Sequence, residues 1–152
     1  MQRISLETPL PCSLGAAWAA VEQRTLLEYV THPLLKIMSP TLEALPNRFF
    51  GGTFYLKRYL FGFLPLGRHT IKVVKLDAAR HELVTAESGT LLKGWNHRIT
   101  ICTDAAGRTV YRDELVLDAG YLTPVVGLFA NAFYRYRQAR WRKLAPGLGE
   151  LR

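Results

Sequence analysis

A long amphipathic helix is predicted at residues 123–145, after a stretch of chain whose patterns are almost all typical of strands. Thr123 is a suitable N-cap with Pro124 at the first helical position, and Pro146 ends the pattern. At about 100° per residue, one face of this helix collects Leu122, Val126, Phe129, Phe133, Tyr136 and Leu144, joined near its end by Arg137 and Arg140. An apolar stripe of this length must be covered, so we expect the helix to pack on one face of a large sheet.

The segments before this helix predict a sheet that is interrupted only near its beginning. Residues 3–10 alternate as a first strand, and short helices are predicted at residues 13–21 and 25–33. Further strands are predicted at residues 41–45, 53–61, 68–76, 82–88, 95–103 and 109–118. Their short connections favour antiparallel neighbours. The predicted fold class is α+β, a seven-stranded antiparallel curved sheet with two short helices after the first strand and a long C-terminal helix.

The composition fits one globular domain over residues 1–152. Hydrophobic residues make up 49% and charged residues 21%, which excludes disordered and fibrous classes. Cys12 and Cys102 lack the paired spacing of a disulfide framework or a zinc site. No segment has the pattern of a signal peptide or the ~20 apolar residues that span a bilayer. We therefore expect a cytoplasmic protein with reduced cysteines.

Basic residues outnumber acidic ones by 20 to 12, which gives a formal net charge of +8. Such a charge suggests nucleic acid, anionic lipid or acidic ligands as partners. Five basic residues fall within residues 133–143, but a helical projection spreads them around the helix. Cations at this end also stabilise the negative end of the helix dipole by about 0.3–1 kcal/mol each. Nucleic acid is therefore not the expected partner, and docking of this helix to an anionic membrane or RNA stays an alternative.

The final third of the chain carries the most particular pattern. It contains Gly94-Trp95-Asn96-His97-Arg98, then Gly107-Arg108-Thr109-Val110-Tyr111-Arg112-Asp113-Glu114-Leu115-Val116, then Gly120 and Tyr134-Arg135-Tyr136-Arg137. Together with the element order, this pattern resembles the START-like superfamily, also called SRPBCC, and above all its polyketide cyclase and dehydratase-like branch. The resemblance implies a helix-grip fold that holds an apolar or aromatic small molecule, a lipid or a polyketide-like compound between sheet and helix.

Strand alternation assigns polar side chains to the predicted interior. In one strand the inward set is Trp95, His97, Ile99 and Ile101. In the next strand, Tyr111 and Asp113 point the same way if the loop between the two strands has an odd length. Residues 105–107 form a three-residue loop, which meets this condition. Gly107 can adopt the left-handed conformation that commonly ends such a loop. This register pairs Ile99 with Asp113 and places His97 diagonal to Asp113, within side-chain reach.

A buried Asp113 needs a partner, because an unpaired buried carboxylate is costly or stays protonated. His97 and Arg137 are the predicted partners, either as a polar pair that ties sheet to helix or as groups that orient a ligand or transfer a proton. His69 is expected to point inward in the same way. The predicted ligand-binding residues are Tyr55, His69, Trp95, His97, Tyr111, Asp113, Val126, Phe129, Phe133 and Arg137.

The predicted function is binding of an apolar or aromatic small molecule or lipid, as carrier or sensor, in a cavity between the sheet and the C-terminal helix. The sequence has no metal or nucleotide motif and no nucleophile elbow, so no metal or other cofactor is expected. The alternative is a metal-independent cyclase or dehydratase-like enzyme acting on a polyketide-like substrate in the same cavity. Such chemistry needs only a positioned acid and base, for which His97 and Asp113 are the candidates, with Tyr111 and Tyr55 as further donors.

Residues 59–67 are almost wholly apolar although they are predicted to connect two strands. Basic residues flank this segment at Lys57, Arg58 and Arg68. Apolar tips with basic neighbours are typical of proteins that touch anionic membranes. We therefore expect peripheral membrane contact through Leu60, Phe61, Phe63 and Leu64, with a longer packed hairpin or a dimer contact as the alternatives.

Overall fold

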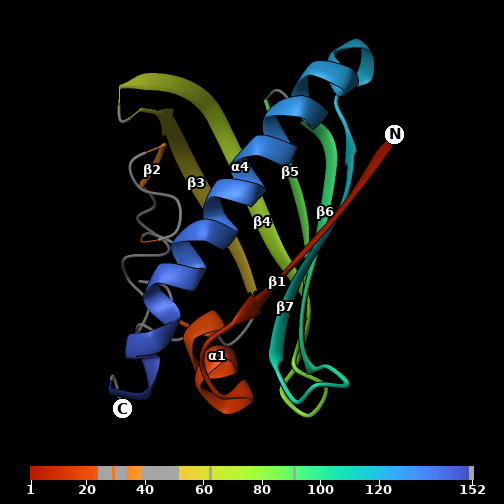
Figure 1. Ribbon diagram of the computed structural model, residues 1–152. Helices are drawn as coiled ribbons and strands as arrows, with labels where there is room; N and C mark the ends of the chain where they lie inside the picture. The colour runs from red at the N-terminus through yellow and green to blue at the C-terminus, as the bar shows by residue number, and fades with distance from the viewer. Residues whose placement is uncertain (24–28, 30–33, 39–51, 62, 91, 151–152) are drawn as a thin grey trace.

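The computed structural model describes residues 1–152 except 24–28, 30–33, 39–51, 62, 91 and 151–152. In the described part, an antiparallel sheet curves around a long C-terminal helix (Figure 1). The strands are β1 (Gln2–Leu10), β2 (Leu35–Met38), β3 (Gly52–Leu60), β4 (Leu64–Asp77), β5 (Glu82–Gly89), β6 (Leu92–Thr103) and β7 (Thr109–Asp118). The helices are α1 (Leu14–Val21) and α4 (Thr123–Leu144), with 3-10 turns η1 (Gly120–Leu122) and η2 (Ala145–Glu150).

The strands lie in the order β1-β7-β6-β5-β4-β3-β2. Strands β2 to β7 therefore follow one another as a meander, and β1 completes the sheet beside β7. Asp113 of β7 pairs with Leu6 of β1 on one side and with Ile99 of β6 on the other. Since α4 packs along β1 and β7, the helix covers this side of the sheet (Figure 1).

Among the described residues, two apolar clusters form the core. One joins α1 to the C-terminal end of α4 and includes Trp18, Ile99, Ile101, Tyr111 and Trp141. The other lies toward the N-terminal end of α4 and includes Trp95, Leu115, Leu117, Phe133 and Tyr134. Full burial of each large apolar side chain contributes about 1.5–3 kcal/mol, so the two clusters hold the helix to the sheet at two separate levels.

The predicted curved antiparallel sheet, the first short helix and the long C-terminal helix are confirmed. The strand predicted at residues 41–45 lies outside the described residues, as does nearly all of the helix predicted at residues 25–33. Thr123 is the first helical residue rather than the cap. The reason is that η1 precedes it directly, and the Thr123 hydroxyl donates a hydrogen bond to the Gly120 carbonyl at 2.7 Å.

The apolar segment predicted as a connection continues strands β3 and β4. Leu60 pairs with Leu64, and Tyr59 pairs with Pro65, so the two strands extend almost to Phe61. The backbone of this segment therefore forms the longer hairpin that was one of the alternatives.

The buried face of α4 differs from the predicted stripe. Its buried residues are Gly127, Ala130, Phe133, Tyr134, Arg137, Gln138 and Trp141. Phe129 is 42% exposed and Leu122 is also exposed, so their predicted burial is wrong. Apolar residues surround the first turns of the helix, so periodicity does not single out one face there. On the observed face α4 packs along β1, and Gly127 lies against the side chain of Gln2.

Candidate functional site

A layer of polar side chains crosses the inner face of the sheet between the two apolar clusters. The residues of this polar layer are His69 on β4, Thr85 and Glu87 on β5, His97 on β6, Asp113 on β7, and Arg137 and Gln138 on α4. Along β6, His97 lies between Trp95 of one cluster and Ile99 of the other, because alternate residues of a strand share a face. The alternation that points apolar side chains of β6 into the core therefore also points His97 into it.

Asp113 lies at the centre of the polar layer and is only 2% exposed. Its Oδ1 accepts hydrogen bonds from His97 Nε2 at 2.7 Å and from the Tyr111 hydroxyl at 2.9 Å. Its Oδ2 accepts one from Gln138 Nε2 at 3.0 Å. Both oxygens are thus satisfied, which offsets the cost of burying a carboxylate.

The charges around Asp113 keep it ionised. Burial favours the neutral acid, but the hydrogen bond and charge of His97, the charge of Arg137 and the hydrogen bond of Gln138 together lower the pKa of Asp113 below its ordinary value. Burial and the nearby Asp113 charge raise the pKa of Tyr111 well above its ordinary value. Tyr111 therefore stays protonated and donates to the carboxylate.

A second histidine–carboxylate pair lies beside the first. His69 Nε2 is 2.7 Å from Glu87 Oε2, and the Thr85 hydroxyl donates to Glu87 Oε1 at 2.8 Å. Burial would raise the pKa of Glu87, yet the hydrogen bond and charge of His69 and the charge of His97 lower it. The two pairs act on each other and form one electrostatic unit.

Aromatic rings and a buried cation close the layer on the helix side. The Arg137 side chain is 7% exposed, and its Cζ lies 4.9 Å from the centre of the Tyr134 ring. The same ring meets His97 edge-on at 4.9 Å, and its hydroxyl accepts from Trp95 Nε1 at 3.4 Å. Arg137 Nε has no hydrogen-bond partner in the described part of the chain. Burial disfavours the charge of Arg137, but the surrounding acidic groups, Tyr111 and Tyr134 first, raise its pKa overall.

Most of the predicted ligand-binding residues come together on this inner face. The buried ones are His69, Trp95, His97, Tyr111, Asp113, Phe133 and Arg137. Val126 is partly buried against the cluster that contains Trp95. Phe129 stacks on Phe133, with ring centres 5.8 Å apart, at the margin of the interior.

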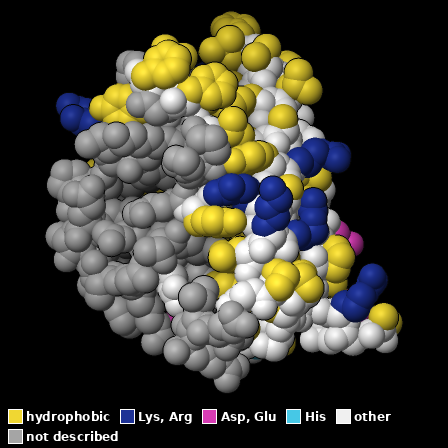
Figure 2. Space-filling view, turned by 60° about the vertical axis from the view of Figure 1, so that its left-hand side comes forward, with side chains coloured by type: hydrophobic (Ala, Val, Ile, Leu, Met, Phe, Trp, Pro, Cys, Tyr) yellow, Lys and Arg dark blue, Asp and Glu magenta, His cyan; other side chains and the backbone are white. Residues whose placement is uncertain are grey.

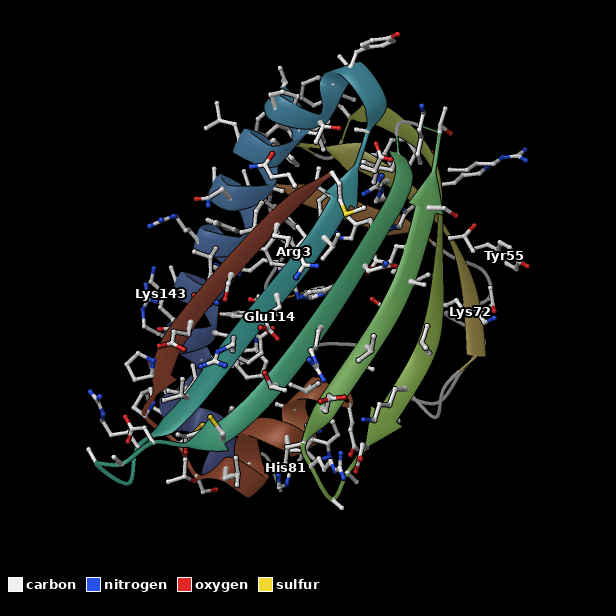
Figure 3. All side chains as sticks on the ribbon, turned by 90° about the vertical axis from the view of Figure 1, so that its right-hand side faces the viewer. Arg3, Tyr55, Lys72, His81, Glu114 and Lys143 are labelled. Atoms are coloured by element: carbon white, nitrogen blue, oxygen red, sulfur yellow. The ribbon has the colours of Figure 1, made fainter. Side chains whose placement is uncertain are left out.

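Tyr55 is the exception, and its predicted place in the interior is wrong. It is 61% exposed and projects, like Lys72, from the face of the sheet turned away from α4 (Figure 3). The cause is the strand register, in which Tyr55 pairs with Thr70 while Leu56 pairs with His69. Paired residues share a face and neighbours alternate, so Tyr55 and His69 lie on opposite sides of the sheet.

Of the two partners predicted for Asp113, only His97 is hydrogen-bonded to it. Arg137 acts on Asp113 through charge, and no ion pair between them occurs among the described residues. Gln138, the next residue along α4, takes the expected position. The helix rotation described above brings Gln138 rather than the Arg137 guanidinium onto the carboxylate.

Sequence reasoning missed Glu87, Thr85, Gln138, Tyr134 and the inward Arg58. The pairing of β5 with β6 carries a signal for Glu87 and Thr85, because Glu87 lies opposite Trp95 and Thr85 lies opposite His97. Residues directly opposite each other share a face, so the inward set of β6 identifies the inward set of β5. Nothing comparable in the local sequence identifies Gln138 or Arg58.

Exposed apolar side chains gather at one end of the molecule, called the apolar end below. They are Phe61, Phe63 and Leu64 of the β3–β4 hairpin and Tyr121, Leu122, Val125, Leu128 and Phe129 around the start of α4. Figure 2 shows hydrophobic side chains along the top of the molecule, over the hairpin and the first turns of α4. Of the four residues predicted to contact a membrane, Phe61, Phe63 and Leu64 are exposed, whereas Leu60 is partly buried against the cluster that contains Trp95. The start of the helix extends the exposed apolar surface.

Across the described residues, no group of three or more His, Cys, Asp or Glu side chains is placed to hold a metal ion. Within the same residues, no helix is long and apolar enough to cross a membrane.

Solved structures share this fold at low sequence identity. A START superfamily protein from Mycobacterium smegmatis matches with a TM-score of 0.71 at 14% identity, over 96% of this chain and 98% of that one. A protein from Chromobacterium violaceum matches with a TM-score of 0.71 at 10% identity, over 95% and 98%. An AHSA1-like protein from Aeromonas hydrophila matches with a TM-score of 0.64 at 13% identity, over 97% and 94%. These matches show a START-like helix-grip fold.

Sequence comparison gives a narrower result. No curated protein matches the chain. A family model described as "Domain of unknown function (DUF8410)" matches residues 9–145, which is most of the chain, and the chain therefore belongs to the DUF8410 family.

Proposed function

We propose that this protein binds a small molecule with an apolar or aromatic body between the inner face of the sheet and α4, as a carrier or sensor. The observation that carries the proposal is that buried aromatic side chains lie beside a buried hydrogen-bond donor that has no acceptor among the described residues. Trp95, Phe133 and Tyr134 are buried beside Arg137, whose Nε has no partner among the described residues. An unsatisfied buried donor costs about 1–3 kcal/mol, and a bound molecule that supplies an acceptor would remove this cost.

Acid–base catalysis is a second candidate, favoured by the 2.7 Å contact between His97 Nε2 and Asp113 Oδ1. A carboxylate in this position can orient an imidazole that accepts a proton from a substrate. The carrier function takes precedence because Asp113 already accepts three hydrogen bonds from the protein, including one from Gln138. These bonds suit a carboxylate that holds the neighbouring protein side chains in place.

Mass spectrometry of solvent extracts from protein purified without added ligand tests the proposal. We expect one recurrent compound from the wild type and its loss from Phe133→Ala, which shortens an interior aromatic side chain. Lys72→Ala, on the outer face of the sheet, should keep the compound. Turnover of that compound, abolished by His97→Ala while binding survives, would favour the enzyme. Extracts without a bound compound, together with no thermal stabilisation by aromatic or lipid probes, would contradict the proposal.

We further propose that the apolar end contacts an anionic membrane, where an apolar ligand could be taken up or released. Its apolar residues come from two separate elements and are accompanied by the exposed cations Lys57, Arg68 and Lys93. The only described carboxylates close to this end are Glu87, which is largely buried, and Asp118, which accepts from the Gly120 amide. Apolar side chains among cations, with little opposing charge, suit an interface of anionic headgroups and acyl chains.

Sedimentation with vesicles of phosphatidylcholine and phosphatidylserine tests this contact. Phe63→Asp combined with Leu128→Asp should release a protein that the wild type retains, and raised salt should weaken retention. Val74→Asp removes a similarly exposed apolar residue from strand β4 and should not alter retention. Equal retention of all variants would contradict the proposal, and a concentration-dependent dimer lost in the double variant would assign the surface to a second copy of the chain.

A further inference from the structure

Each carboxylate oxygen of the polar layer is hydrogen-bonded by the protein itself, whereas the buried His69 Nδ1 has no hydrogen-bond partner among the described residues. Both oxygens of Asp113 accept from protein donors, and both oxygens of Glu87 are engaged, by His69 and Thr85. Neither carboxylate forms an ion pair with an arginine within the described residues. The negative charge of the layer is therefore held by histidine and neutral donors.

Two buried arginines each have one guanidinium nitrogen without an acceptor among the described residues. The Nε atoms of Arg58 on β3 and Arg137 on α4 are both buried and have no hydrogen-bond partner among the described residues. Both guanidiniums lie close enough to Glu87 and Tyr134 for these groups to act on their charge. With both Nε atoms buried, Arg58 on β3 and Arg137 on α4 reach the interior from the sheet and from the helix.

The two unpaired donors both belong to cations. Arginine cannot be deprotonated in a protein, so a buried guanidinium needs an acceptor and, above all, a negative one. The pKa of Arg58 is lowered because burial disfavours its charge more than Glu87 and Tyr134 stabilise it. The two unpaired Nε donors would be satisfied by a group with several acceptor oxygens and a negative charge.

We infer that the ligand of this interior carries an anionic oxygen group, a carboxylate or a phosphate monoester, held between Arg58 and Arg137 with its apolar body against Trp95, Phe133 and Tyr134. The inference rests on the proposed function, because it names the chemistry of the same site. Guanidinium groups recognise carboxylate and phosphate through paired N–H donors, and such charge-assisted bonds are about twice as strong as neutral ones. The polar layer therefore selects the head of the ligand, while the aromatic side chains accept its body.

Titration calorimetry with three matched probes tests the inference: 2-naphthoate, 2-naphthyl phosphate and the neutral 2-naphthylmethanol. The wild type should bind at least one anion about tenfold more tightly than the alcohol. The two anions distinguish a carboxylate head from a phosphate head. Arg137→Gln should remove the preference for the anion and leave the affinity for the alcohol within about twofold.

Three further variants separate recognition from folding. Arg58→Gln should reduce the same preference from the other side of the site, and Arg137→Lys, which keeps the charge, should retain part of it. Arg135→Gln makes the same charge change at an exposed position on α4 and should leave the preference unchanged. Thermal melts establish that each variant is folded.

The outcomes are distinguishable. Equal affinity of the wild type for the alcohol and both anions would overturn the inference and leave the proposed function standing. A preference for anions that survives in both Arg58→Gln and Arg137→Gln would overturn it as well. If none of the three probes binds, the proposed function itself is contradicted and the inference falls with it.

Discussion

The side-chain amide of Gln138 donates a hydrogen bond to the buried carboxylate of Asp113, with Nε2 3.0 Å from Oδ2. The same Nε2 lies 3.0 Å from the carbonyl oxygen of Leu6. One helix side chain therefore ties α4 to β7 and β1, the two strands along which it packs. The contact fixes the rotation of the helix and with it the direction of Arg137.

Gln138→Ala should lower the free energy of unfolding by about 1–3 kcal/mol, because it removes a donor from the buried Asp113 carboxylate and from the partly buried Leu6 carbonyl. Urea denaturation measures the change. Arg135→Ala, which removes an exposed contact to Asn131 on the same helix, should stay within about 0.5 kcal/mol of the wild type. Equal stability of the two variants would mean that the Gln138 contact does not hold the helix.

Asp113→Asn should make stability less sensitive to acid. The folded protein holds the pKa of Asp113 below its ordinary value of 3.8, so the unfolded chain takes up a proton first as the pH falls. The stabilisation by ionised Asp113 is therefore present above the ordinary value and is lost as the pH falls through the folded value. The stability difference between wild type and Asp113→Asn should shrink between about pH 5 and about pH 3. A constant difference over this range, measured by urea denaturation at each pH, would contradict the assignment.

Alkaline titration should separate the buried tyrosines from the exposed ones. Burial, together with the charge of Asp113, raises the pKa of Tyr111 well above 10, and burial also raises the pKa of Tyr134. Stabilisation by their protonated hydroxyls is present below about pH 10 and is lost as the pH rises further, because only the unfolded chain then ionises them readily. Near-ultraviolet absorbance should show their phenolates appearing only with unfolding, and Tyr111→Phe should reduce that step. Ionisation of all tyrosines in the folded state would contradict the burial of Tyr111 and Tyr134.

Gly89→Ala should destabilise the protein by about 1–3 kcal/mol, because overpacking displaces backbone. A Cβ at this position would lie 2.6 Å from the Arg68 carbonyl oxygen and 3.1 Å from His69 Nδ1. Gly94→Ala on the neighbouring strand is the matched control, since a Cβ there meets nothing within 4 Å. Thermal unfolding compares the two variants, and a destabilised Gly94→Ala with an unaffected Gly89→Ala would contradict the packing around His69.

Phe61→Asn should separate stability from membrane contact. Phe61 has a φ of 54°, a conformation that asparagine adopts with less strain than phenylalanine. We expect the variant to be as stable as the wild type or up to about 1 kcal/mol more stable, while its retention on anionic vesicles falls. Val74→Asn changes a residue with the same 59% exposure outside the apolar end and should keep full retention. Loss of retention in both variants would point to a general effect of surface hydrophobicity.

The hairpin between β6 and β7 could be predicted in detail from the sequence. Gly107 adopts a φ of 79°, and Ile99 pairs with Asp113, as the three-residue loop predicted. The inward positions of His97 and Asp113 follow from this register. Each of these features depends on period-two alternation and on turn chemistry, which are properties of residues close together in the chain.

The rotation of α4 could not be predicted in the same way. Apolar residues surround its first turns, so several helical faces were compatible with the pattern, and the chosen stripe wrongly buried Phe129. The packing of α4 on β1 and the bond from Gln138 to Asp113 accompany the actual face. Both are contacts between residues far apart in the chain.

The sequence by itself determined the antiparallel sheet, the long C-terminal helix and the inward residues of β6 and β7, because local periodicity and loop length fix these features, whereas strand β2 was not predicted. Only the tertiary structure decided that Arg58 and Gln138 join His97 and Asp113 in the interior. The physical reason is that helix rotation and sheet curvature result from the packing of many side chains at once, and no single segment encodes them.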